Sequence, residues 1–213
     1  MDYLISICMG YLLGSFPTAF FILKKAKEID ITNSGSGNVG AYNSYEVSKS
    51  KTLGLLVLLI DALKGLLSVY LIIVILPRGF TYPALSLIFA IFSHCYNPWI
   101  YLKGGRGLAT AAGGVILLFP ILLFIWGIVW AIVYLIKKDI IWGNILATIF
   151  SLIIITASPD IAYKYTFPKA DSVSTMVLFV SALLIIIFSR HIEPLKDLIK
   201  INNLISVKGK NEQ

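Results

Sequence analysis

Two glycine-rich segments combine a permissive backbone with polar side chains that can bind an anion. The first, residues 33–40, reads Asn-Ser-Gly-Ser-Gly-Asn-Val-Gly, and the second, residues 103–107, reads Lys-Gly-Gly-Arg-Gly. Glycines let backbone N–H groups converge on one negative charge, and an apolar helix that starts after the second segment adds a partial positive charge. Both segments therefore predict a phosphate site, with a plain turn between helices as the alternative. The candidate residues are Gly35, Ser36, Gly37, Asn38, Lys103, Gly104, Gly105, Arg106 and Gly107.

Known nucleotide-binding and hydrolase motifs do not fit these segments. Residues 35–40 formally match G-x-G-x-x-G, but that fingerprint needs a preceding strand and a βαβ unit, whereas this segment joins two apolar runs. The second segment lacks the Walker A spacing, and Ser36 lacks the G-x-S-x-G context of a hydrolase nucleophile. With these motifs excluded, the two glycine segments keep only the general capacity to bind an anion.

The chain has two histidines, His94 and His191, and each lies at the end of an apolar run near a basic residue or a glycine segment. Histidine exchanges a proton near neutral pH, so two histidines beside two anion-binding segments indicate a site rather than isolated polar tips. No Cys/His/Asp cluster with ligand spacing accompanies them. The sequence therefore predicts neither a metal nor another cofactor.

Asp61 and Lys64 are two charged residues one helical turn apart inside an apolar run. A charge near the centre of a bilayer costs about 2.5–3.5 kcal/mol, so both side chains should face protein. We expect them to form a structural pair with each other, and a direct role in chemistry is the alternative.

The composition identifies the elements that must position these residues. Of the 213 residues, 58% are hydrophobic and only 14% are charged, and the mean hydropathy is +0.86. Soluble domains are about 45–50% apolar and about 25% charged, so disorder, a collagen-like fibre and a soluble enzyme are excluded. The net charge of +7 is explained by orientation in a bilayer, without nucleic acid as a partner. We expect an all-α, polytopic membrane protein.

The apolar runs predict about seven transmembrane helices in a single domain, residues 1–213. Pro120 divides one uncharged stretch of thirty residues into two helices, the first too short to span alone. With this division, 14 of the 18 cations lie on one side, which places the N-terminus outside and the C-terminus in the cytoplasm. Small residues at 109–114 predict close helix packing. The expected runs are 3–23, 52–76, 80–93, 107–136, 140–157 and 174–189.

Three sequence blocks resemble the bacterial PlsY family, membrane acyltransferases that use acyl phosphate as donor. They are residues 35–43 with 61–65, residues 94–110, and residues 190–193. The resemblance implies transfer of a fatty acyl group from acyl phosphate to the hydroxyl of glycerol 3-phosphate, giving lysophosphatidic acid and phosphate for phospholipid synthesis. It also implies a multi-pass protein of the bacterial cytoplasmic membrane, coupled to an enzyme that produces acyl phosphate. The H-x4-D signature of other acyltransferases is absent.

The resemblance also assigns roles to residues. It implies catalytic roles for His191, Ser36 and Asn38, and it adds Asn43 and Thr110 to the substrate-binding candidates among the glycine segments. The proton of the acceptor hydroxyl goes either to the phosphate of the donor or to His191, and no acyl-enzyme is expected. The implied structural residues are Asp61, Lys64, His94 and Glu193.

Four positions depart from the family pattern. Glu46 stands where the family has arginine, and Pro194 where it has asparagine, both positions that help to hold glycerol 3-phosphate. Tyr42 replaces threonine, and Arg106 replaces lysine, which keeps the charge as a planar fork. These changes predict an intact donor half and an altered acceptor half. A relative with another acceptor, or a non-catalytic binder or transporter of anionic lipid, is therefore the alternative.

Overall fold

The computed structural model describes residues 1–76 and 79–200. Within these ranges the regular elements are all helices and none is a strand, as the all-α prediction requires. Short 3-10 helices, η1 (Ile31–Asn33) and η2 (Pro98–Ile100), lie in two of the connections. The α-helices are α1 (Asp2–Ser15), α2 (Thr18–Lys27), α3 (Ala41–Ser48), α4 (Lys51–Ile75), α5 (Thr81–Cys95), α6 (Leu108–Leu118), α7 (Pro120–Lys137), α8 (Ile140–Ala157), α9 (Pro159–Tyr163) and α10 (Val173–Ser189), followed by a helix over Ile192–Lys200.

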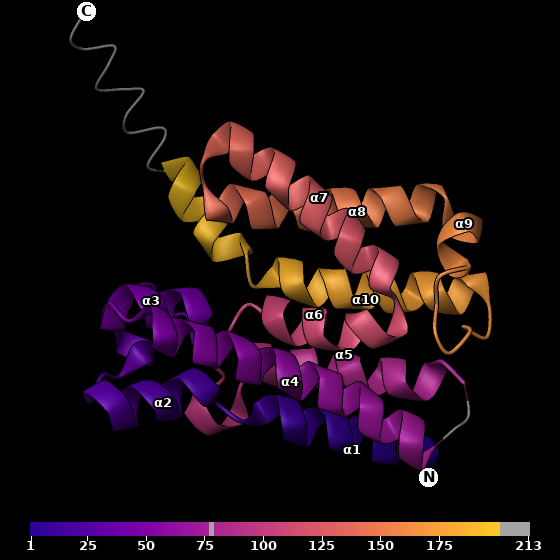
Figure 1. The fold of residues 1–213 in the computed structure, drawn as a ribbon, viewed down its shortest axis with the longest axis horizontal. Helices are drawn as coiled ribbons and strands as arrows, with labels where there is room; N and C mark the ends of the chain where they lie inside the picture. The colour runs from indigo at the N-terminus through magenta and orange to yellow at the C-terminus, as the bar shows by residue number, and fades with distance from the viewer. Residues whose placement is uncertain (77–78, 201–213) are drawn as a thin grey trace, which may run out of the picture.

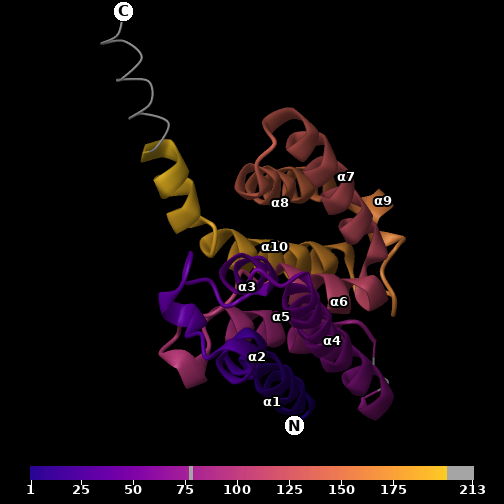
Figure 2. The ribbon, with the colours of Figure 1, turned by 60° about the vertical axis from the view of Figure 1, so that its left-hand side comes forward.

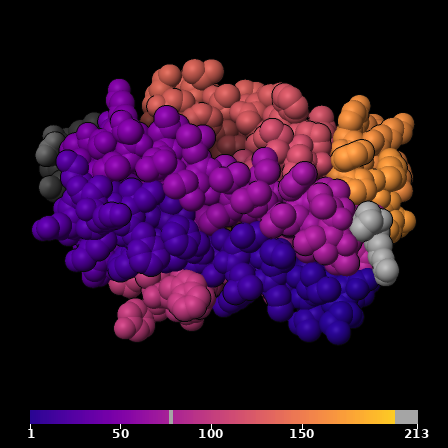
Figure 3. Space-filling model, turned by 60° about the horizontal axis from the view of Figure 1, so that its bottom comes forward, coloured from indigo at the N-terminus to yellow at the C-terminus, as the bar shows by residue number. Residues whose placement is uncertain are grey.

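The long helices pack side by side in two groups joined by α10. Helices α1, α4 and α5 pack against one another, α6 packs on α4 and α5, and α7 and α8 form a second pair that touches the first group where α7 contacts α6 (Figures 1 and 2). Helix α10 contacts both α5 and α8 and so lies between the groups. The N-terminus lies at one end, and both glycine segments with the helix Ile192–Lys200 lie at the other, which we call the loop end (Figure 1). The turn between α5 and α6 emerges there beside α2 (Figure 3), because Ile100 packs with Ala19 and Leu23.

Several helices have the length and composition of membrane spans, so the protein is an integral membrane protein. The combined α1–α2 segment, α4, α7 and α8 are each long and apolar enough, and α10 qualifies together with the helix Ile192–Lys200, from which a bend of 45° separates it. The predicted division at Pro120 is confirmed, because α6 ends at Leu118 and α7 begins at Pro120. Seven passes with an external N-terminus stay a prediction.

The first apolar run differs from expectation, because it forms two helices rather than one. Pro17 separates α1 from α2, since proline has no N–H to donate within the helix. The Ser15 carbonyl accepts from the amide of Asn97 (2.6 Å), and the Phe16 carbonyl accepts from the Lys64 ammonium (2.7 Å). Side chains from α4 and from the turn after α5 thus satisfy carbonyls at the break.

Charged and small residues join α4 to its neighbours. The predicted pair forms: the Lys64 ammonium lies 2.7 Å from an Asp61 carboxylate oxygen, and both residues are buried. A Cβ atom on Gly65 would lie 1.8 Å from the carbonyl oxygen of Thr110, and one on Gly113 would lie 1.8 Å from that of Ala62. The backbones of α4 and α6 are therefore in direct contact, which confirms the packing predicted for residues 109–114.

Candidate active site

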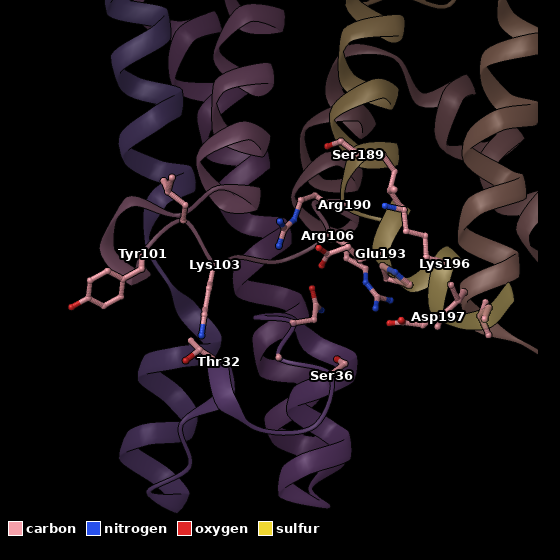
Figure 4. A pocket seen from close by; sticks show the side chains of 17 residues that line it. Thr32, Ser36, Tyr101, Lys103, Arg106, Ser189, Arg190, Glu193, Lys196 and Asp197 are labelled. Atoms are coloured by element: carbon pink, nitrogen blue, oxygen red, sulfur yellow. The ribbon is translucent and has the colours of Figure 1, made fainter. Parts of the chain in front are cut away.

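An open cavity of about 750 Å³ lies at the loop end, where three distant parts of the chain meet (Figure 4). Arg106 and Arg190 point into its middle, whereas Tyr101 points outward at its rim. The polar lining predicts a ligand with several charged or hydroxyl groups. The lining residues are Thr32, Ser36, Gly37, Asn38, Tyr101, Leu102, Lys103, Arg106, Ile141, Ser189, Arg190, Ile192, Glu193, Pro194, Lys196, Asp197 and Leu198.

The second glycine segment is folded tightly against the end of α5. The Gly105 N–H donates to the His94 carbonyl (3.1 Å), and a Cβ atom on Gly105 would lie 2.0 Å from Nε2 of His94. A Cβ atom on Gly104 would lie 2.3 Å from the His94 carbonyl oxygen. Gly107, with φ +81°, precedes α6 in the left-handed region that glycine tolerates. The glycines therefore serve close packing and the entry into α6.

Asn43 organises the first glycine segment from within. Its side chain is buried at 1% exposure, and its Oδ1 accepts from the Ser36 N–H (3.1 Å). Its Nδ2 donates to the carbonyls of Ser34 and Asn38, both at 3.0 Å. The Asn43 amide thus holds the loop closed and does not line the cavity, and its expected role in substrate binding stays a prediction.

Three backbone donors expected to hold a phosphate are already used. The N–H groups of Ser36 and Gly105 donate to Asn43 and His94, and the Gly37 N–H donates to the Ser34 carbonyl (3.0 Å). These three N–H groups thus have acceptors within the protein, and the expected cradle of backbone donors stays a prediction. The side chains of Ser36 and Asn38 do line the cavity, and they leave hydroxyl and amide groups available there.

Two guanidinium groups supply the positive charge of the cavity. Arg190 donates from Nε and Nη2 to the carbonyls of Gly105 (3.3 Å) and Gly104 (3.4 Å), and it stacks over the Tyr96 ring at 5.2 Å. Burial and the charge of Arg190 lower the pKa of Arg106. Within residues 1–76 and 79–200, neither guanidinium has a carboxylate partner within 4.0 Å. This unneutralised pair favours an anion. Sequence reasoning missed Arg190, although it stands directly before His191.

His191 is a buried, neutral imidazole with one free nitrogen. It is 1% exposed, and its Nδ1 lies 2.8 Å from the Ile187 carbonyl, so Nδ1 carries the hydrogen. Burial lowers the pKa of His191 to about 4. Among the described residues, Nε2 has no hydrogen-bond partner. Its lone pair is therefore unused, and His191 lies next to Arg190 without lining the cavity itself.

The remaining predicted residues divide between the cavity and the core. His94 is buried, with Nδ1 3.9 Å from an Asp61 carboxylate oxygen, and it lies behind the second glycine segment. Thr110 is buried and does not line the cavity, whereas Glu193, expected to be structural, does.

Lys103 lines the cavity, and its ammonium donates to Asn33 (3.3 Å). Between them, the described residues form no group of three metal-ligating side chains. Cavity residues that sequence reasoning missed also include Thr32, Tyr101, Ser189, Lys196 and Asp197.

The departures from the family pattern lie at different distances from the cavity. Pro194 lines it, whereas Glu46 does not. Glu46 is exposed on α3, where burial and then the hydrogen bond to Glu46 raise the pKa of Tyr42. The charge of Glu46 also reaches Arg106. Glu46 therefore acts on the cavity from its periphery.

An apolar groove leads away from this polar cavity between α6, α7 and α10. It starts at Leu108, directly after Gly107, and at Ile187, whose carbonyl binds His191. Leu108 and Ile187 of the groove each lie two residues from a cavity residue, Arg106 and Ser189, an arrangement that suits a lipid with a charged head. The groove is lined by Leu108, Ala111, Ala112, Val115, Leu122, Leu123, Trp126, Leu183, Leu184 and Ile187.

Comparison with known proteins assigns the family. The profile of the glycerol-3-phosphate acyltransferase family matches residues 4–201. The chain belongs to this family. It is 40% identical over 114 residues to a glycerol-3-phosphate acyltransferase of Myxococcus xanthus, covering 54% of this chain and 59% of that protein. It is 35% identical over 148 residues to glycerol-3-phosphate acyltransferase 2 of Moorella thermoacetica, covering 68% and 73%. The chain spans about three fifths of the length of the first relatives, 59% and 61%.

Solved structures of the family share the fold. The chain superposes with a TM-score of 0.75 on the crystal structure of PlsY, an integral membrane glycerol 3-phosphate acyltransferase, in its glycerol 3-phosphate form. The identity is 26%, and the superposition covers 94% of this chain and 93% of that chain. The lysophosphatidic acid form of PlsY gives a TM-score of 0.74. The family assignment thus extends over almost the whole chain.

Proposed function

We propose that this protein is a membrane acyltransferase that transfers a fatty acyl group from acyl phosphate to glycerol 3-phosphate, giving lysophosphatidic acid and phosphate. One observation carries the proposal: a cavity with two unneutralised arginines and an apolar groove begin within two residues of each other, and the buried His191, with its free Nε2, directly follows Arg190 of the cavity. An acyl phosphate has the matching shape, a dianionic head on an apolar chain. Membership of the glycerol-3-phosphate acyltransferase family supports the same activity.

In this mechanism the groove holds the acyl chain and the cavity holds the phosphate. Arg106, with Ser36 and Asn38, binds the phosphate of the donor, and Lys103 and Lys196 attract the acceptor. The acceptor oxygen attacks the acyl carbonyl carbon, and the bond from that carbon to the phosphate oxygen breaks. The electron pair leaves with the phosphate, where the guanidinium stabilises the developing charge.

His191 orients the acceptor hydroxyl rather than storing its proton. Its Nε2 accepts the hydroxyl hydrogen bond, which directs an oxygen lone pair toward the acyl carbon. Because burial lowers the pKa of His191 to about 4, an imidazolium is unfavourable near neutral pH. The proton therefore ends on the released phosphate, and no acyl-enzyme forms.

The location and partners follow from the distribution of charge. The protein forms a single domain that passes seven times through the cytoplasmic membrane of a bacterium. The loop end faces the cytoplasm, where 14 of the 18 cations then lie. An enzyme that produces acyl phosphate supplies the donor at this face.

A second candidate is the same transfer to an acceptor that carries a positive charge. Glu193 and Asp197 line the cavity beside the cations, and Pro194 offers no side-chain hydrogen bond to an acceptor. A carboxylate wall repels a dianion and attracts an ammonium group. An amino-alcohol phosphate, with both charges, complements this mixed lining.

The deciding experiment uses the purified protein in nanodiscs with palmitoyl phosphate and glycerol 3-phosphate. Phosphate release and lysophosphatidate formation are measured together, with Arg106→Gln as the site control. Equal amounts of both products, reduced in the variant, support the proposal. Phosphate release only with ethanolamine phosphate favours the second candidate. Binding of palmitoyl phosphate with no product from any acceptor identifies a non-catalytic lipid binder.

A further inference from the structure

Helix α7 carries a stack of aromatic rings that the mechanism above does not use. Trp126 and Trp130 stack with their ring centroids 6.4 Å apart, and Trp130 stacks on Tyr134 at 5.0 Å. Both indole N–H groups donate to α8, from Trp126 to Thr148 (3.2 Å) and from Trp130 to Asn144 (2.9 Å). Polar contacts between helices are a main source of specific association in lipid. The stack therefore fixes α7 on α8.

Trp126 is the member of this stack that also lines the apolar groove. Among the groove residues it contributes the one aromatic ring, and the α6 wall carries Ala111 and Ala112 at its centre. Rotation of the indole would break its hydrogen bond to Thr148, which is itself buried. The ring therefore forms a rigid wall, unlike the aliphatic side chains of α7 and α10 that line the rest of the groove.

We propose that Trp126 is a specificity-determining residue that selects the shape of the acyl chain. This inference rests on the proposed function. A straight saturated chain lies along the flat ring, whereas a chain bent by a cis double bond needs a wider groove. Thr148, whose hydroxyl accepts the hydrogen bond from the Trp126 indole N–H, is a positioning residue because this bond keeps the ring in the wall.

The test compares stearoyl phosphate with oleoyl phosphate, which have equal length and differ by one cis double bond. The ratio of their kcat/KM values is measured for the wild type, Trp126→Leu, Thr148→Val and Trp142→Leu. The wild type is expected to favour stearoyl phosphate, and Trp126→Leu to lower this preference about tenfold, the scale on which an apolar pocket distinguishes closely similar chains. Thr148→Val releases the ring and gives a smaller change. Trp142→Leu, the same substitution on α8 away from the groove lining, leaves the ratio unchanged.

Other outcomes overturn the inference. If Trp126→Leu leaves the ratio of kcat/KM values unchanged, Trp126 does not select the acyl chain. An equal loss of activity with both donors would then assign the ring a structural role only. The ratio of dissociation constants, measured by displacement of radiolabelled palmitoyl phosphate, gives the same comparison without turnover. A wild type that binds both lipids and produces nothing refutes the proposed function, while a shifted binding ratio in Trp126→Leu still supports selection by Trp126.

Discussion

A methyl group on Gly104 would test whether the second glycine segment positions the site. In Gly104→Ala the new Cβ would lie 2.3 Å from the His94 carbonyl oxygen and 2.4 Å from the Cys95 carbonyl oxygen. Neighbouring atoms essentially never approach a Cβ within 3.0 Å, so the segment must move by roughly 0.7 Å. Both obstacles are backbone atoms at the end of α5, and rotation of a side chain cannot relieve the clash.

That movement reaches the reacting groups because the Gly104 carbonyl is shared. It accepts from the Val39 N–H (3.2 Å) and from Nη2 of Arg190 (3.4 Å), so a shift disturbs both the first glycine segment and the guanidinium. A misplacement of about 1 Å costs about hundredfold in rate. We therefore expect kcat/KM to fall about tenfold to hundredfold, with a loss of about 1–3 kcal/mol in folding stability from overpacking.

The assay measures phosphate release from palmitoyl phosphate in the presence of glycerol 3-phosphate, together with thermal unfolding. Gly127→Ala is the matched control, because a Cβ at this position on α7 meets no atom within 4 Å. The control should retain full activity. The reasoning is refuted if folded Gly104→Ala also turns over within twofold of the wild type, since the segment would then have no role in positioning.

Three further perturbations test the charges. Arg106→Gln removes an unneutralised cation and should raise the KM for acyl phosphate at least about tenfold. Arg106→Lys keeps the charge and should retain most of the affinity. Equal KM values for the wild type and Arg106→Gln in steady-state kinetics would contradict this expectation. Lys64→Met leaves the buried Asp61 carboxylate unpaired and should cost about 3–5 kcal/mol in thermal unfolding, most of it recovered by adding Asp61→Asn. The pKa of His191 is about 4 in the folded protein and about 6.5 in the unfolded chain, so protons favour unfolding and stability should fall by about 3 kcal/mol as pH drops from 6.5 to 4. In His191→Asn, the free energy of unfolding measured by denaturant titration should lose this part of its pH dependence. The same pH dependence in the variant and the wild type would show that His191 does not contribute to it.

The sequence predicted the bounds of most apolar helices closely. The run expected at 140–157 forms α8 over Ile140–Ala157, and the division at Pro120 forms as expected. The reason is physical: in lipid each backbone polar group must be satisfied within its own helix, so the apolar run sets the helix length. Pro17 was the exception, because whether proline breaks a helix depends on which distant donors reach the free carbonyls. Here Lys64 and Asn97 reach them.

The sequence also predicted segments that border the cavity, but not the contacts that each group makes. Ser36, Asn38 and Lys103 line the cavity as expected, whereas Asn43 lies beneath its loop and Thr110 in the helix contact. Residue type and spacing give the capacity to bind an anion. They cannot show that a donor already has an internal acceptor.

By itself, then, the sequence determined the helices, the glycine-rich segments and the paired charges of α4, because these follow from local composition and from the cost of burying charge. Only the tertiary structure decided that Arg190 joins Arg106, that His191 keeps a free Nε2, and that an apolar groove begins beside them. Each of these depends on contacts between residues far apart in the chain. Arg190 reaches the carbonyl of Gly104 across 86 positions, a contact that no local pattern encodes.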